Sequence, residues 1–249
     1  MGDSMDPLVS ERLFIDWLPP AAPAVHIDHE RVIVIQGRSG FYLDVRYMHA
    51  DSGADTLGWA TAGWKTLQPV GQGQDPRARF TAVFDSHKLQ SSSPHAQTAT
   101  SGVGPEPEDP PDEGSFSTLS NGDVLEQGEM RRPETGEVTP YRELWRRLPL
   151  ILHGDQSAPV RVVLLETIDA GTDKAFLGRV GDFEVCIAQQ GARVDTRIRR
   201  YSGSAWVTTS STYAGDETAL PSLDGVEQLA VQNEFGLAGR RWKVIENSV

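Results

Sequence analysis

The stretch Phe41-Tyr42-Leu43-Asp44-Val45-Arg46-Tyr47-Met48 alternates a fully apolar and aromatic row of side chains with a mixed row. This period of two is that of a β-strand, in which successive side chains point to opposite faces. The mixed row contains a charged pair, Asp44 and Arg46. The simplest arrangement buries the apolar row inside a barrel. The alternative turns the mixed row inward and packs the apolar row against a neighbouring barrel or a dimer partner.

Further strand-like runs recur along the chain. They fall at residues 12–17, 78–84, 160–167, 183–187, 192–201 and 241–246, and dipeptides such as Gln36-Gly37 and Gly181-Asp182 separate many of them. Short strands at this spacing are typical of an antiparallel sandwich or barrel. Only residues 221–231 carry apolar side chains at helical spacing. We therefore predict an all-β chain with one short helix.

The composition of the chain changes in two places. Residues 91–121 are rich in Ser, Thr, Pro and Gly and carry five acidic side chains without a Lys or Arg. Such a segment buries too little apolar surface to offset the entropy lost on ordering, so we expect a mobile acidic loop that serves as a lid, a partner-binding tail or a tolerated insertion. A polar stretch at residues 153–159 predicts a boundary between an N-terminal β-barrel domain, residues 1–153, and a C-terminal one, residues 154–249.

Charge and hydropathy exclude several classes of partner. The formal net charge of −12 disfavours nucleic acids and anionic membrane surfaces. No apolar run approaches the ~20 residues of a membrane span, and residues 1–10 lack the basic and apolar regions of a signal peptide. We expect a cytoplasmic protein, with the nucleus as a further compartment. The single cysteine, Cys186, lies in an apolar run and is expected to be buried.

The sequence lacks the usual signatures of cofactor and metal sites. It contains no glycine-rich dinucleotide or phosphate-binding motif and no G-x-S-x-G nucleophile elbow. His26 and His29 have a chelating spacing, but no third ligand follows at a recognised distance. We expect neither a cofactor nor a metal site.

Three blocks of the sequence resemble the fungal Hri family. Residues 57–63 read Leu-Gly-Trp-Ala-Thr-Ala-Gly, similar to the family's W-A-x-A-G signature. Residues 133–145 read Pro-Glu-Thr-Gly-Glu-Val-Thr-Pro-Tyr-Arg-Glu-Leu-Trp, similar to its N-P-x-T-G and P-Y-x-E-L-W segments. Residues 239–246 resemble its closing N-W-x-V-I-E strand. Order and spacing agree from about Arg12 to Glu246.

The resemblance implies two tandem antiparallel, lipocalin-like β-barrels inside the cell, in a family whose yeast member is named for interacting with a protein kinase. One block departs from the family. Residues 79–86 read Arg-Phe-Thr-Ala-Val-Phe-Asp-Ser, where filamentous-fungal members carry T-W-x-H-W-x-D-S. The loss of both tryptophans indicates a barrel interior reshaped for a different ligand. At the level of fold alone, the chain is also similar to tropolone-sesquiterpenoid hetero-Diels–Alderases.

Candidate site residues gather in the N-terminal half. An inward-facing Arg46 must be paired or bind an oxygen, and Asp44 is the partner that a purely structural role would use. Arg46 and Tyr42 are our candidate catalytic residues, with Arg46 donating hydrogen bonds to an oxygen of the ligand. Aromatic side chains are equally expected in a core. Those assigned to substrate binding are Trp59, Trp64, Phe84, Tyr141 and Trp145.

These features lead to two hypotheses from different classes. The first is a cofactor-independent cycloaddition catalyst of fungal secondary metabolism, which holds a small apolar, polyketide-like or terpenoid-like substrate in a reactive pose. A metabolite carrier would need the same aromatic walls and donor. The second is a non-catalytic interaction protein with a protein kinase as partner. Both hypotheses are compatible with a homodimer. Trp145 and Trp242 each close a family block and are expected to stabilise the fold.

Overall fold

Antiparallel strands make up most of the structure, a computed structural model that describes residues 4–19, 30–48, 55–91, 110–132, 135–150, 159–168, 171–213, 215, 220–224, 231 and 233–248. The first eight strands pair in chain order, and β1 pairs with β8 to close a barrel. They are β1 (Leu8–Trp17), β2 (Glu30–Gln36), β3 (Phe41–Met48), β4 (Thr56–Gln68), β5 (Arg77–Asp85), β6 (Glu113–Thr118), β7 (Val124–Arg131) and β8 (Val138–Arg147).

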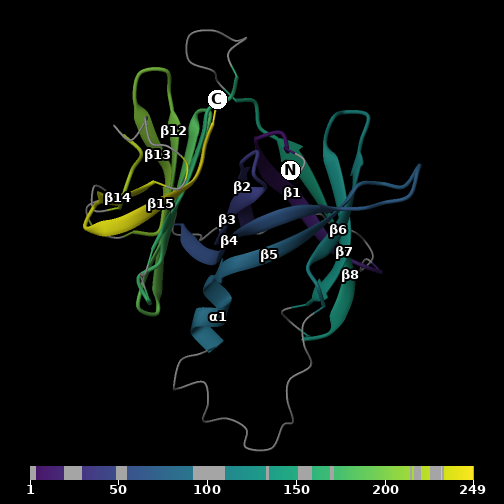
Figure 1. Cartoon of the computed structure of the whole chain (residues 1–249). Helices are drawn as coiled ribbons and strands as arrows, with labels where there is room; N and C mark the ends of the chain where they lie inside the picture. Colours follow the sequence, from purple (N-terminus) through teal and green to yellow (C-terminus); the bar gives the residue numbers. More distant parts are fainter. Residues whose placement is uncertain are drawn as a thin grey trace, which may run out of the picture.

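The later strands form a seven-stranded antiparallel sheet in the order β13-β12-β11-β10-β9-β15-β14. This sheet, green to yellow in Figure 1, lies beside the barrel on the side of β2, β3 and β4. The predicted all-β fold is confirmed. Where a second barrel was expected, the described residues form an open sheet, with β13 and β14 as its edge strands. Its strands are β9 (Val162–Thr167), β10 (Ala175–Val180), β11 (Phe183–Gln190), β12 (Arg193–Tyr201), β13 (Trp206–Ser211), β14 (Glu234–Leu237) and β15 (Arg240–Ser248).

The apolar row of β3 faces the second sheet, not the barrel interior. Leu43 and Ile35 come so close to Gly178 of β10 that a Cβ there would lie 3.0 and 2.5 Å from their methyl carbons. Phe41 packs on Phe176 with ring centroids 6.2 Å apart. Burial of such side chains is favourable by roughly 1.5–3 kcal/mol each. The shared core comprises Val9, Ile33, Ile35, Phe41, Leu43, Val45, Tyr47, Ala60, Ala62, Phe84, Val162, Leu164, Phe176, Val180, Phe183, Val185, Ile187 and Ile198.

This packing turns the mixed row of β3 into the barrel. Successive residues of a strand point to opposite faces, so Tyr42, Asp44 and Arg46 face inward when their neighbours face the second sheet. Of the two arrangements that the sequence left open, the structure therefore has the second. The barrel interior is lined by charged and aromatic side chains, and the large aliphatic core lies between the two bodies.

A separate core lies on the other face of the second sheet. Cys186 is fully buried there, as predicted, and burial raises the pKa of its thiol to about 12. Trp242 is also fully buried, and its Nε1 donates a hydrogen bond to the Leu237 carbonyl at 3.0 Å. This core comprises Val163, Leu165, Ala175, Leu177, Cys186, Ala188, Leu220, Leu223, Trp242 and Val244.

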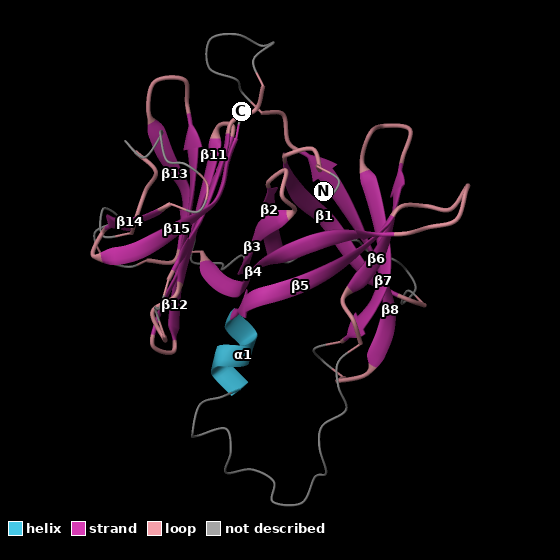
Figure 2. Cartoon of the chain, in the orientation of Figure 1, coloured by secondary structure: helices cyan, strands magenta, loops and turns pink. Residues whose placement is uncertain are grey.

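The described helix is not where the sequence indicated it. Helix α1 (Ser86–Ser91) directly follows β5 (Figure 2), and Asp85 caps it by accepting a hydrogen bond from the His87 backbone N–H at 2.9 Å. Of the helix predicted at residues 221–231, residues 221–224 are not helical and residues 225–230 lie outside the described part. Within the described residues, no helix combines the length and apolar character that crossing a membrane requires.

The predicted acidic loop is shorter than expected at its C-terminal end. Within residues 91–121, β6 (Glu113–Thr118) pairs with β7, and Gly114 lies opposite Gly128. Its polar composition hid the strand, because Phe116 is the one large apolar side chain that it contains. Residues 92–109 lie outside the described part, and so do residues 151–158. The domain boundary at 153/154 therefore stays a prediction.

Candidate functional site

Strand β3 places a charged pair in the barrel interior. Arg46 donates hydrogen bonds from Nε and Nη2 to Asp44 Oδ2, at 3.2 and 2.8 Å. Both side chains are largely buried, 13% exposed for Arg46 and 10% for Asp44. The other carboxylate oxygen, Asp44 Oδ1, is buried and has no hydrogen-bond partner among the described residues. A buried oxygen without a donor costs about 1–3 kcal/mol, so the inward row presents an acceptor that the fold itself does not use.

An aromatic ring holds Arg46 from the neighbouring strand. Trp59 of β4 is in register with Arg46, and the guanidinium carbon lies 4.3 Å from the centroid of its ring. The indole Nε1 of Trp59 donates to Asp85 Oδ1 at 2.8 Å, and the His87 ring stacks on the indole at 4.8 Å. Arg46 is thus fixed by a carboxylate and an aromatic face, two contacts that both favour its charged form.

A second ion pair joins β1 to β8 inside the barrel. Arg12 donates to Glu143 Oε1 at 2.9 Å and to Glu30 Oε2 at 2.8 Å. Burial raises the pKa of Glu143, and the charges of Arg12 and Arg46 oppose that shift. Burial lowers the pKa of Arg46, but the carboxylates of Asp44 and Glu143 outweigh it and the net shift is upward. The two ion pairs therefore share one electrostatic field.

A third group lies where β7 and β8 pair. The Tyr141 hydroxyl donates to Glu126 Oε1 at 3.1 Å. Burial, followed by the charge of Glu143, raises the pKa of Glu126 to about 8, although Lys65 opposes the shift. Lys65 Nζ lies 4.3 Å from the centroid of the Phe116 ring, and burial lowers the pKa of this amine. Glu126 is therefore largely protonated at neutral pH.

Two glycines leave room for the Tyr141–Glu126 hydrogen bond. A Cβ on Gly114 would lie 2.7 Å from Glu126 Oε1, and a Cβ on Gly128 would lie 2.8 Å from the Tyr141 hydroxyl. Side chains at these two positions would collide with Glu126 and Tyr141, so glycine at both positions makes room for their hydrogen bond.

Asp112 lies at the edge of the interior, next to β5 and β6. Its backbone carbonyl accepts a hydrogen bond from the Phe80 N–H at 2.8 Å, and the residue is exposed. Desolvation by the surrounding protein raises the pKa of its carboxyl to about 6; Glu143 and Asp44 add to the shift, and Arg46 opposes it. Asp112 thus marks a point where solvent meets the acidic interior.

The sequence-predicted site residues divide between the two faces of the barrel wall. Trp64 packs on Phe41 at 4.9 Å between ring centroids, and Phe84 packs on Phe176 at 5.5 Å. Both therefore face the second sheet and do not join the interior. The predicted site residues that the structure brings together inside the barrel are Tyr42, Arg46, Trp59, Tyr141 and Trp145.

Trp145 carries the second polar atom of the interior that the fold does not use. It shares the inward phase of Tyr141 and Glu143 on β8. Its indole Nε1 is buried and, among the described residues, has no hydrogen-bond partner. The interior therefore holds one unused acceptor, Asp44 Oδ1, and one unused donor. The predicted structural role of Trp145 stays a prediction.

Sequence reasoning missed most of the charged interior. The available signal was parity: Glu143 stands between Tyr141 and Trp145 at intervals of two, and Lys65 stands six residues after Trp59. The interior residues that were not predicted are Arg12, Lys65, Asp112, Glu126 and Glu143.

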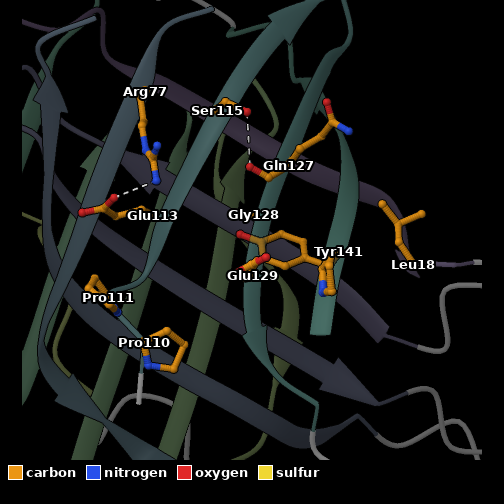
Figure 3. A pocket seen from close by; sticks show the side chains of 11 residues that line it. Leu18, Arg77, Pro110, Pro111, Glu113, Ser115, Gln127, Gly128, Glu129 and Tyr141 are labelled. Atoms are coloured by element: carbon orange, nitrogen blue, oxygen red, sulfur yellow. Dashed lines mark hydrogen bonds and ion pairs between the residues drawn. The ribbon is translucent and has the colours of Figure 1, made fainter. Parts of the chain in front are cut away.

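Among the hollows on the surface of the described residues, two are open to solvent and neither is lined by Asp44 or Arg46. One, of about 390 Å³, is bordered by Pro110, Tyr141 and the Arg77–Glu113 ion pair (Figure 3). The other, of about 320 Å³, lies between the β5–α1 segment and the second sheet, with Lys88 and Lys174 at its border. No group of three or more His, Cys, Asp or Glu side chains in the described part is arranged to hold a metal ion. His26 and His29 lie outside it.

Fold and interior together define a class of protein: an antiparallel β-barrel with a charged interior, packed against a second antiparallel sheet. The sequence profile of the family described as Protein HRI1 matches residues 8–246, and the chain belongs to this family. The family resemblance found in the sequence blocks is thereby confirmed. The comparisons give no support to the similarity with hetero-Diels–Alderases.

One solved structure shares the whole architecture. It is a crystal structure of an uncharacterized protein from Saccharomyces cerevisiae, with a TM-score of 0.73 and 15% sequence identity, and the match covers 98% of this chain and 100% of that chain. At this identity the likeness shows the fold alone. A comparison with curated proteins gave no match.

Proposed function

We propose that the N-terminal barrel binds a small polar molecule in its interior, with Asp44 and Arg46 as its main contacts. The observation that carries this proposal is the buried Asp44 Oδ1, which has no partner among the described residues although its carboxylate is held by Arg46. A ligand that donates a hydrogen bond to this oxygen would remove the cost of leaving it unpaired.

The geometry of the pair suits recognition of polar groups. The hydrogen bonds to Asp44 use Nε and Nη2 of Arg46, which leaves Nη1 to donate to an oxygen of the ligand. Trp59 fixes the orientation of the guanidinium, so little further side-chain entropy is lost on binding. Hydrogen bonds to charged groups contribute about 1.5–3 kcal/mol each. A wholly apolar ligand would leave these groups unpaired.

The test compares two arginines that have the same local geometry. Arg193 on β12 also donates from Nε and Nη2 to one oxygen of the aspartate two residues away, at 3.0 and 2.8 Å, but it is 55% exposed and lies in the second sheet. Small polar compounds are screened by ligand-detected NMR, and the dissociation constant of each hit is measured. We expect Arg46→Met to weaken binding about 10- to 100-fold and Arg193→Met to leave it unchanged. Hits that bind both variants as tightly as the wild type would contradict the proposal.

The cycloaddition activity is a narrower form of this proposal. Its support is the inward orientation of Arg46, since a donor aimed at a bound carbonyl lowers the barrier of such a reaction. We expect Arg46→Met to reduce turnover of an enone substrate by about 10²–10³-fold. Equal product formation with and without the protein would rule out the cycloaddition activity and leave the binding proposal in place.

A second candidate function is the non-catalytic protein-interaction role, with a protein kinase as the expected partner. It is favoured by the fact that the two hollows described above are open to solvent and are not lined by Asp44 or Arg46. Affinity purification with the wild type and with Arg46→Met distinguishes the two candidates. A kinase recovered equally by both proteins would support the interaction role, and small molecules recovered by the wild type alone would support the binding barrel.

A further inference from the structure

Carboxyl groups outnumber cations in the barrel interior and at its edge. Among the described residues, five carboxyl groups, one of which belongs to the largely protonated Glu126, stand near three cationic side chains from β1, β3 and β4; the charge of a fourth cation, Arg147 of β8, also acts on Lys65. The carboxyl groups are those of Glu30, Asp44, Asp112, Glu126 and Glu143, and the cations are Arg12, Arg46 and Lys65.

The two guanidiniums are committed to three of these carboxylates. Arg12 is shared between Glu143 and Glu30, and Arg46 is bound to Asp44. Lys65 lies over the Phe116 ring and acts on Glu126 only through space. Glu126 accepts its hydrogen bond from a neutral tyrosine hydroxyl, and no ion pair within the described part involves Asp112.

The unused acceptor lies near a second carboxylate, that of Asp112. Asp44 is nine-tenths buried, and its Oδ1 faces inward without a donor. Tyr42, on the same face of β3, is close enough to Asp44 and Asp112 for both charges to raise the pKa of its hydroxyl, after burial. The ring of Phe80 lies 5.7 Å from that of Tyr42. An acceptor, a second carboxylate and two aromatic rings are therefore gathered at one edge of the interior.

An ammonium group matches this combination. It has three N–H donors and no acceptor, and it is attracted both to carboxylates and to the faces of aromatic rings. A carboxylate or phosphate ligand would bring a further negative charge next to Asp44 and Asp112, two carboxylates that lie near a single guanidinium, that of Arg46. A quaternary ammonium group would be attracted to the carboxylates, but it has no N–H group and would leave Asp44 Oδ1 without a hydrogen bond.

We infer that the barrel interior takes a small primary or secondary ammonium compound, whose N–H group donates to Asp44 Oδ1 beside Asp112. This inference rests on the proposed function of the barrel and specifies the chemical class of its ligand. The organic part of the ligand is small, because charged side chains already occupy much of the interior.

The experiment uses three small probes of similar size and different charge. Ethylammonium, acetamide and acetate are titrated separately into the full chain at neutral pH, with ionic strength held constant by NaCl. The readouts are the indole N–H signals of Trp59 and Trp145 in NMR spectra, which report on the interior, and the dissociation constant from calorimetry. We expect saturable shifts of these signals with ethylammonium, and binding at least about tenfold weaker for acetamide and acetate.

Two aspartate variants locate the contact. Asp44→Asn should weaken ethylammonium binding about tenfold or more. Asp195→Asn removes the aspartate of the matched pair on β12 and should leave binding unchanged. If Asp44→Asn does not fold, Asp112→Asn at the exposed edge replaces it and should also weaken binding.

Each result separates the inference from the proposed function. Tighter binding of acetamide or acetate than of ethylammonium, with sensitivity to Arg46→Met, would overturn the ammonium inference and keep the binding barrel. If NaCl alone shifted the indole N–H signals as much as ethylammonium does, the shifts would be an effect of ionic strength, and the inference would be overturned. Absence of binding by all three probes and by the screened polar compounds would overturn both.

Discussion

Asp44 accepts both hydrogen bonds of Arg46 through one oxygen, Oδ2, while its other oxygen is buried without a partner among the described residues. Residues two apart on a strand lie side by side on one face. On a solvated face such a pair contributes about 0–1 kcal/mol to stability. Here the neighbouring apolar row packs against the second sheet, and this contact turns the pair into the barrel. The second sheet thus determines which side chains of β3 line the barrel interior.

The Arg12–Glu143 ion pair gives a prediction about stability. Arg12→Leu leaves Glu143, 3% exposed, without its charge partner. We expect this variant to lose about 3–5 kcal/mol of unfolding free energy, measured with urea. The double variant Arg12→Leu/Glu143→Leu removes both charges and should recover most of the loss. A double variant that is less stable than the single one would show that the pair itself stabilises the barrel.

The carboxyl group of Glu126 predicts a dependence of stability on pH. Its pKa rises from 4.5 to about 8 on folding, first because of burial. Between these values the folded protein keeps a proton that the unfolded chain releases, so this group's contribution to stability falls as the pH rises and is constant above about 8. Glu126→Gln keeps the acceptor for Tyr141 and should flatten the decline between about pH 5 and pH 8. Glu129→Gln, at an exposed position of the same strand, is the control. Parallel pH profiles for all three proteins would refute the assignment.

Trp242 is predicted to be structural. It is fully buried in the core of the second sheet, and its Nε1 donates to the Leu237 carbonyl. Trp242→Ala should cost roughly 3–5 kcal/mol, a large part of the ~5–15 kcal/mol typical of a folded protein. Trp64→Ala, at a tryptophan that is 37% exposed, should cost less. Chemical unfolding measures the loss of unfolding free energy in both variants. A larger loss for Trp64→Ala than for Trp242→Ala would contradict the prediction.

The strands were predictable from sequence, but the direction in which they face was not. Period-two alternation identifies β3 to the residue. It does not tell which row faces the barrel, because the second sheet buries an apolar row as well as a barrel core does. Lys65 and Glu126 escaped prediction for the same reason, since a charged residue in an alternating strand is normally solvated.

Two of the candidate site residues, Trp64 and Phe84, lie outside the barrel interior for different reasons. Trp59 and Trp64 are five positions apart, so a regular strand sends them to opposite faces, and parity alone predicts that both cannot line one site. Phe80 and Phe84 have the same parity, but an irregularity in the pairing of β4 with β5, between Ala62 and Gly63, moves Phe84 to the outer face. Such a β-bulge leaves no clear mark in a single sequence.

The central claim is that the barrel interior is the binding site. The most direct measurement is a crystal structure of the full chain soaked with the small polar compounds that bind it in solution. We predict a bound molecule inside the barrel, within hydrogen-bond distance of Asp44 Oδ1 or of Arg46. Compounds found only in the outer hollow beside Pro110 and Tyr141, or only between β5 and the second sheet, would contradict the account.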